Sequence, residues 1–191
     1  MYSTKNTEEK VFESKFIEPG VHVVKITAIK GEEPDGYSPR LTISFASEDE
    51  KSVEAVFYMS EKAQDMSLRK IKHLATKCIK VSVLDKIEAD SLEDYASALF
   101  KTLKNKVVRV KFVGEEIEGK EGKNNWVKAN IGLPAFAEAV TKGAEHDPVP
   151  AESSKLSYDK NNKWDFKPLP TADLENANQD GDGDGDDDQP F

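Results

Sequence analysis

The chain has 191 residues, with 27 basic and 36 acidic side chains and a net charge of −9. Its length suits one domain, and an apolar fraction of 37% predicts a modest core under a heavily charged surface. Residues 173–191 contain eight acidic residues and no Lys or Arg, so the rest of the chain holds 27 basic against 28 of the 36 acidic residues. The acidity therefore belongs to the tail, and a nucleic-acid-binding body is not excluded.

Cysteine content and hydropathy exclude several other classes. The single cysteine, Cys78, excludes an intramolecular disulfide and a cysteine-based metal site, and its apolar helical context predicts a small core residue. No run of ~18 apolar residues is present to span a membrane. The polar N-terminus lacks the apolar core of a signal peptide, so we expect a reducing, cytoplasmic setting.

The first part of the chain predicts an arm and three strands. Residues 1–15 are charged without periodicity, which predicts a flexible arm. β-branched residues in alternating patterns predict strands at residues 22–30, 40–47 and 52–59. The loop at residues 31–39 is dense in turn formers and contains Tyr37. We expect a three-stranded antiparallel meander.

The periodicity then becomes helical. Apolar residues three to five apart predict a helix that runs from Ser60 to Cys78, with Ser60 as its N-cap. A second helix is predicted to begin at Ser91, where Asp94 completes a pattern that resembles a capping box. Residues 78–86 between them fit either a short strand or an extended connector.

Strand character resumes at residues 106–114 and 125–134, and residues 134–142 predict a short helix at best. Residues 143–172 read as a linker in which a few aromatic residues could pack, namely Tyr158, Trp164 and Phe166. Residues 173–191 are predicted to be disordered.

This order of elements resembles that of the OB-fold, a small Greek-key barrel that commonly binds oligonucleotides. We therefore predict a mainly β protein. A five-stranded OB-fold-like barrel at residues 16–142 carries a helical insertion between strands 3 and 4, and a disordered acidic C-terminal tail follows.

Alternation assigns the side chains of the last two strands to faces. Val108, Val110 and Phe112 share one side of the fourth strand, which leaves Arg109 and Lys111 on the other. In the fifth strand, Trp126 and Lys128 lie opposite an apolar set. If the apolar sets face the core, one outer surface presents all four polar-face residues together.

Rings between cations suit unpaired nucleic acid, because an aromatic ring stacks on any base and Lys or Arg neutralises phosphates. The candidate residues for single-stranded DNA (ssDNA) are Lys25, Tyr37, Arg40, Tyr58, Arg109, Lys111, Trp126 and Lys128. A second interpretation of Trp126 is packing against the N-terminal arm or a helix. The acid-free basic run at residues 66–84 fits a solvated helix face better than a binding site.

The tail is the most specific feature of the chain. Alternating Asp and Gly cannot build a core or a helix, yet the acidic run closes with Pro190 and Phe191. This pattern predicts an aromatic anchor that acidic residues steer into a basic-rimmed pocket. The ending, Asp-Asp-Asp-Gln-Pro-Phe at residues 186–191, resembles the Asp-Asp-Asp-Ile-Pro-Phe tip of bacterial single-stranded DNA-binding proteins.

Phage ssDNA-binding proteins similarly combine an OB domain with an acidic tail ending in Phe. The resemblance implies that the tip docks on replication, recombination or repair proteins (helicase, polymerase, primase or nuclease) and competes with DNA for the basic groove. It is carried by Asp186, Asp187, Asp188, Pro190 and Phe191. Gln189 replaces the usual Ile, which removes an apolar contact. A divergent phage-type member, acting in the host cytoplasm, fits best.

Other function classes receive less support. His22, His73 and His146 have no metal-ligand spacing, and no Walker loop, GxGxxG or GxSxG is present, so we expect no enzyme, no cofactor and no metal. Residues 180–185 match half of an EF-hand loop, but the twelfth position is Phe191 rather than Glu. The alternative function is a protein-interaction scaffold or DNA mimic. A homo-oligomer is compatible with the sequence.

Overall fold

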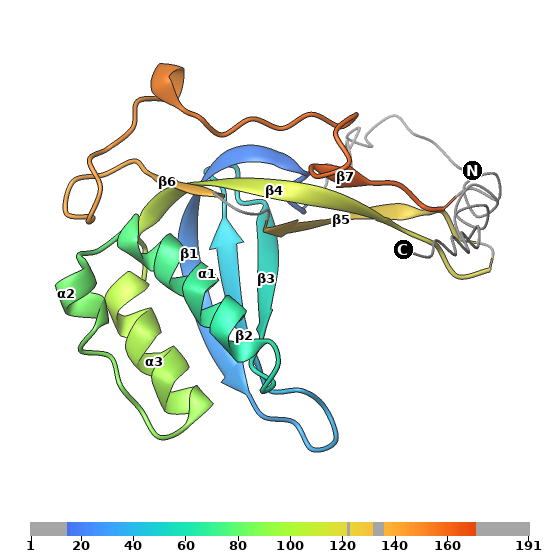
Figure 1. The fold of residues 1–191 in the computed structure, drawn as a ribbon. Coiled ribbons are helices and arrows are strands. Elements are labelled where there is room, and N and C mark those ends of the chain that lie inside the picture. Colours follow the sequence, from blue (N-terminus) through green and yellow to red (C-terminus); the bar gives the residue numbers. More distant parts are fainter. Residues whose placement is uncertain (1–14, 122, 132–135, 171–191) are drawn as a thin grey trace, which may run out of the picture.

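The computed structural model describes residues 15–121, 123–131 and 136–170. Its elements in chain order are β1 (Gly20–Glu32), β2 (Arg40–Ala46), β3 (Ser52–Tyr58), α1 (Gln64–Thr76), α2 (Val81–Leu84), α3 (Leu92–Leu103), β4 (Val107–Ile117), β5 (Trp126–Ile131), β6 (Ala137–Ala139), a 3₁₀ turn η1 (Ala151–Ser153) and β7 (Phe166–Lys167). The predicted arm before residue 15 and the tail from residue 171 lie outside the described residues. The three helices lie together beside the sheet, between β3 and β4 in the chain (Figure 1).

The strands form one mainly antiparallel sheet in the order β3-β2-β1-β4-β5. This strand order contains the predicted meander of β1, β2 and β3 and the closing hairpin of β4 and β5. The helices are inserted between β3 and β4 in the chain, as predicted. Both ends of the path, β3 and β5, contact each other, but no hydrogen-bonded pairing joins them within the described ranges. The sheet is therefore OB-like in its order of strands, and closure into the predicted five-stranded barrel is not shown.

Two further strands extend the sheet beyond the predicted five. β6 pairs antiparallel with β4 at Val108–Val110, and β7 pairs parallel with β4 at Gly114 and Glu115. The prediction of a short helix at residues 134–142 was wrong for the part that is described. Ala137 and Ala139 are buried while Glu138 between them is half-buried, which is the period of a strand.

Alternation in the strands builds the core as predicted. Leu41, Ile43 and Phe45 of β2 are fully buried, and so are Val108, Val110 and Phe112 of β4. The rings of Phe45 and Phe112 meet edge to face, with centroids 5.7 Å apart. The residues between these apolar positions therefore point away from the core.

The helices begin partly where the sequence predicts. α3 starts after Ser91, whose hydroxyl accepts a hydrogen bond from the Asp94 N–H at 3.1 Å, as a capping box requires. α1 begins at Gln64 rather than after Ser60: its N-cap position is Ala63, which makes no side-chain cap hydrogen bond, and the Ser60 carbonyl accepts from the N–H groups of Ala63 and Gln64. The ambiguous residues 78–86 contain the short helix α2.

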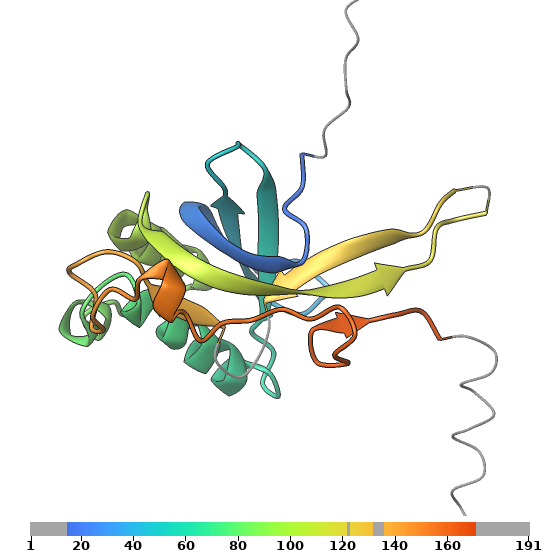
Figure 2. The same ribbon diagram turned by 90° about the horizontal axis from the view of Figure 1, so that it is seen from above.

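Residues 143–170, here called the C-terminal strap, lie along β4 instead of forming a free linker (Figures 1 and 2). The Val149 N–H donates to the Ala139 carbonyl at 2.8 Å, and the Gly114 N–H donates to the Asp165 carbonyl at 2.8 Å. No helix in the described part of the chain is both long and apolar enough to cross a bilayer.

Candidate nucleic-acid interface

The outer face of the sheet is defined by residues that alternate with the core. Directly opposed residues of adjacent strands share a face, so the pairing registers map this surface. Arg40 of β2 lies opposite Tyr58 of β3, and Trp126 of β5 lies opposite Ile117 of β4. The sequence-predicted residues fall into two exposed clusters, one covered pair and the separately exposed Lys25.

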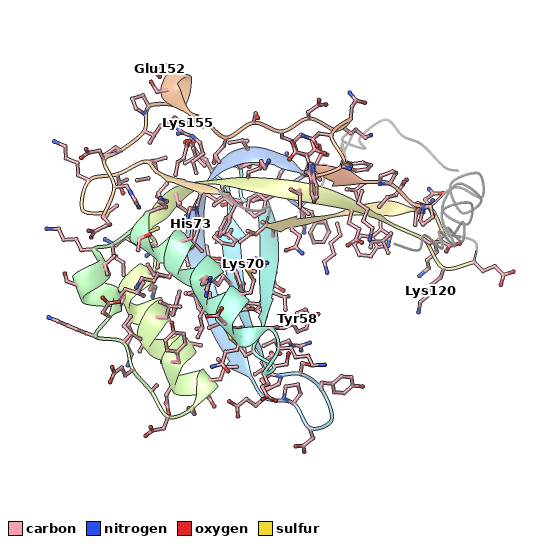
Figure 3. The ribbon with its side chains drawn as sticks, viewed as in Figure 1. Tyr58, Lys70, His73, Lys120, Glu152 and Lys155 are labelled. Carbon is pink, nitrogen blue, oxygen red and sulfur yellow. The ribbon has the colours of Figure 1, made fainter. Side chains whose placement is uncertain are left out.

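The first cluster, here called the loop cluster, consists of Tyr37, Arg40 and Tyr58. The Tyr58 side chain is 54% exposed beside its cross-strand neighbour Arg40, and it lies at the end of β3 away from β4 (Figure 3). Arg40 forms a surface ion pair with Glu32 at 2.6 Å. A pair at this exposure contributes little to stability, so its guanidinium can exchange a carboxylate for a phosphate at small cost.

Tyr37 is held by a turn in the loop between β1 and β2. Its N–H donates to the Pro34 carbonyl at 3.2 Å, and Gly36 has a φ of 75°, a conformation that glycine adopts without strain. The Tyr37 side chain is 79% exposed. The turn therefore presents a phenol ring to solvent at the same end of the sheet as Arg40.

The second cluster, here called the hairpin cluster, consists of Trp126 and Lys128 on the β4–β5 hairpin. Trp126 is 54% exposed, so no described helix seals it, and the arm of the other interpretation lies outside the described residues. Lys128 lies opposite Glu115, which also pairs with Lys167 of β7 at 2.9 Å. The three side chains form a row across β7, β4 and β5. Lys120 marks the hairpin tip in Figure 3, at a different extremity of the sheet from Tyr58.

Arg109 and Lys111 do not lie on an open surface, contrary to the expectation from the sequence. Alternation placed them on the correct face, but the C-terminal strap covers it. Arg109 is 7% exposed and donates to Glu138 at 3.1 Å and to the Val149 carbonyl at 3.0 Å. Lys111 pairs with the buried Asp165 at 2.5 Å. Both cations are already neutralised by the protein itself.

The carboxylates that receive these cations remain charged in the fold. Burial acts to raise the pKa of Glu138, but hydrogen bonds from Ser154, the Lys155 N–H and Arg109 outweigh it and hold the pKa below its usual value. Burial likewise opposes ionisation of Asp165, and hydrogen bonds from Lys111 and the Asp159 N–H lower its pKa. These are structural ion pairs between the strap or β6 and β4.

Lys25 is exposed on β1, opposite Ala46 of β2 and Val107 of β4. Among the described residues, neither Lys25 nor Lys128 forms an ion pair. In total, the structure brings together Tyr37, Arg40 and Tyr58 at one end of the sheet and Trp126 and Lys128 on the hairpin. Lys25 is exposed apart from both clusters, and Arg109 and Lys111 are covered and ion-paired within the protein.

The sequence interpretation did not identify Trp164 as an exposed aromatic residue. Trp164 was read as a linker residue that could pack, but it is 76% exposed, with Lys163 over its ring at 5.4 Å. The alternation of lysines and aromatic residues in KNNKWDFK, at residues 160–167, is the signal that could have identified it.

No protein-family model matches the chain, and no curated protein matches it. A solved structure of yeast RPA bound to ssDNA is 12% identical to this chain, with an alignment that covers 74% of this chain and 85% of that one. The TM-score is 0.34, which is too low to establish a shared fold. The proposals below therefore rest on the geometry of the sheet.

Proposed function

We propose that this protein binds single-stranded DNA without sequence specificity, through the loop cluster and the hairpin cluster. The observation that carries the proposal is the exposure of three aromatic rings beside cations: Tyr58 next to Arg40, Tyr37 on the adjoining turn, and Trp126 beside Lys128. A folded domain gains nothing from leaving such rings in water, whereas an unpaired base gains a stacking surface from them.

The mechanism combines stacking with charge neutralisation. Every base has a π-face, so each aromatic contact contributes roughly 1–3 kcal/mol whatever the sequence. Within the described ranges Lys25 and Lys128 form no ion pair, so their ammonium groups can meet phosphates and release counterions. In the OB-fold the face of strands 2 and 3, together with the loops that flank it, is the surface that binds oligonucleotides. The loop cluster occupies the corresponding strands here.

The near-neutral body sets a further expectation. With 27 basic and 28 acidic residues before residue 173, the domain has little long-range attraction for DNA. Affinity should therefore depend more on stacking than on charge, and its dependence on salt should be shallow. We expect binding that depends on stacking more than on charge to serve a protein that coats and protects ssDNA during replication, recombination or repair.

The acidic segment adds partner recruitment to the proposal. Residues 186–191 lie outside the described part, and the support comes from their sequence: three aspartates, then Pro190 and Phe191. We infer that they dock on a basic-rimmed pocket of a replication or recombination protein and compete with DNA for the domain. Deleting residues 180–191 should leave ssDNA affinity equal or higher at low salt and abolish partner capture. A fall in affinity would contradict the competition.

Binding of labelled oligo-dT tests the central part of the proposal. The intact protein should shift the oligonucleotide in a gel, and Tyr58→Ala and Trp126→Ala should each weaken binding by about fivefold or more. Met66→Ala is the matched control, because Met66 is also 54% exposed but lies on α1. It should leave affinity unchanged. Failure of the intact chain to bind oligo-dT would contradict the proposal and favour a protein-interaction scaffold.

A further inference from the structure

Trp164 has an exposure that no packing role explains. It is one of two tryptophans in the chain, and 76% of its side chain faces solvent. The ring contact that the structure shows for it is with the ammonium of Lys163, at 5.4 Å from the centroid. An indole carries a large apolar surface, so leaving it in water forgoes the stabilisation that burial would give.

The backbone that presents Trp164 is nevertheless tightly held. Its N–H donates to the Asn162 side-chain oxygen at 3.0 Å, and the N–H groups of Asp165 and Phe166 donate to the Asn162 carbonyl at 2.8 and 2.9 Å. The buried Asp165 carboxylate anchors the turn on Lys111 and accepts from the Asp159 N–H at 3.0 Å. The exposed ring therefore stands on a rigid base, so ordering it against a ligand costs little entropy.

Phe166, the residue after Asp165, holds the turn against β4 by a second set of contacts. Phe166 pairs with Gly114 in the parallel β7–β4 ladder. A Cβ on Gly114 would lie 2.6 Å from the Phe166 ring and 2.9 Å from Pro19, so only glycine admits this contact. Anchors on both sides of Trp164, with the ring itself outside, are the arrangement of a presented contact residue.

Lysines near Trp164 in the chain lead from its ring toward the hairpin cluster. Lys163 lies over Trp164, Lys160 lies over the Phe166 ring at 5.2 Å, and Lys167 follows on β7. Lys167 shares the row across β4 with Lys128 of the hairpin cluster, and Glu115 between them forms an exposed ion pair with Lys167 at 2.9 Å. The acid closest in sequence, Asp165, is already paired with Lys111. This surface is cationic and aromatic, which is the chemistry that recognises an unpaired base and its phosphates.

We propose that Trp164 is a second tryptophan stacking site for single-stranded nucleic acid, with Lys163 as its phosphate contact and with Lys167 exchanging its exposed ion pair with Glu115 for a phosphate. The inference rests on the proposed function and deepens it, because it extends the bound strand from the hairpin cluster across β4 onto the C-terminal strap. The strap is then part of the binding surface as well as the cover over Arg109 and Lys111.

The two tryptophans allow each site to be observed separately. Trp126→Phe leaves Trp164 as the single indole, and Trp164→Phe leaves Trp126, so fluorescence titration with oligo-dT reports one site at a time. We expect quenching in both variants. Trp164→Ala should weaken binding about fivefold or more, and Lys163→Gln should weaken it and reduce its salt dependence. Unchanged urea midpoints would show that these exposed substitutions leave the fold intact.

The outcomes separate this inference from the proposed function. Quenching of Trp126 but not of Trp164, or unchanged affinity in Trp164→Ala, would overturn the inference and leave ssDNA binding standing. Absence of quenching at both indoles together with absence of a gel shift would overturn both. Quenching of Trp164 with a loss of affinity in Trp164→Ala would support the inference, and retained binding by the Met66→Ala control would show that the loss is local.

Discussion

Replacing Arg109 by Gln should destabilise the fold without removing a contact to nucleic acid. The Arg109 side chain is 8% exposed and that of its partner Glu138 is 12% exposed. Removing one partner of a buried pair costs about 3–5 kcal/mol, because the other charge is left without compensation. Glu138 keeps hydrogen bonds from Ser154 and the Lys155 N–H, both at 2.7 Å, so we expect about 3 kcal/mol, the lower end of the range.

A double-mutant cycle isolates this interaction. Arg109→Gln and Glu138→Gln should each lower the free energy of unfolding, measured by urea titration with far-ultraviolet circular dichroism. The double variant should lose less than the sum of the two, with a coupling energy of about 1–3 kcal/mol. Independent, additive losses would show that the 3.1 Å contact contributes nothing specific.

The ssDNA affinity of the same Arg109 variant, measured as a function of salt, distinguishes a cation with a structural role from one that contacts DNA. Each phosphate neutralised on a single strand contributes about 0.7 to the slope of log affinity against log salt. Arg109→Gln, studied at a temperature at which it is folded, should keep the slope of the intact protein, whereas Lys128→Gln should reduce it by about 0.7. A reduced slope with unchanged stability in Arg109→Gln would refute the reasoning and restore Arg109 to the binding surface.

Three further changes test the strap and the helices. Gly114→Val should destabilise the domain by about 1–3 kcal/mol in urea, because its side chain would collide with Phe166; an unchanged midpoint would show that the strap is not packed there. Ser91→Ala should cost about 1 kcal/mol in thermal unfolding through loss of the α3 cap, and no change would mean that the cap is dispensable. The pKa values of Glu138 and Asp165 are lowered in the fold. The stability that these carboxylates contribute is therefore fully present above the pKa of an unfolded carboxyl, about 4. It is lost as the pH falls through their lower pKa values in the folded state. Urea midpoints between pH 6 and pH 3 should fall less in Glu138→Gln/Asp165→Asn than in the intact protein, and equal falls would contradict this.

Local patterns were sufficient to predict most of the sheet. Period-two alternation located β1 to β5 because these strands bury one face, as Leu41, Ile43 and Phe45 illustrate. The same rule correctly placed Arg109 and Lys111 on the outer face. It could not show what covers that face, because the partners Glu138 and Asp165 come 29 and 54 residues later in the chain.

The strap was missed for a related reason. Its residues have no consistent period, since it is held by individual backbone and side-chain hydrogen bonds rather than by one apolar face. Trp164 was consequently read as a residue that could pack, although in this segment it is the neighbouring Asp165 that is buried. The strand β6 was expected to be helical because Ala and Glu favour helices, and tertiary pairing with β4 overrides that preference.

The measurement that tests the central claim most directly is a map of backbone amide chemical shifts in the intact protein as oligo-dT is added. We expect the largest changes at Tyr37, Arg40, Tyr58, Trp126 and Lys128, with the amides of α1 to α3 unmoved. Changes confined to the helices, or no changes at saturating oligonucleotide, would contradict the claim that exposed rings and cations on the outer face hold the single strand.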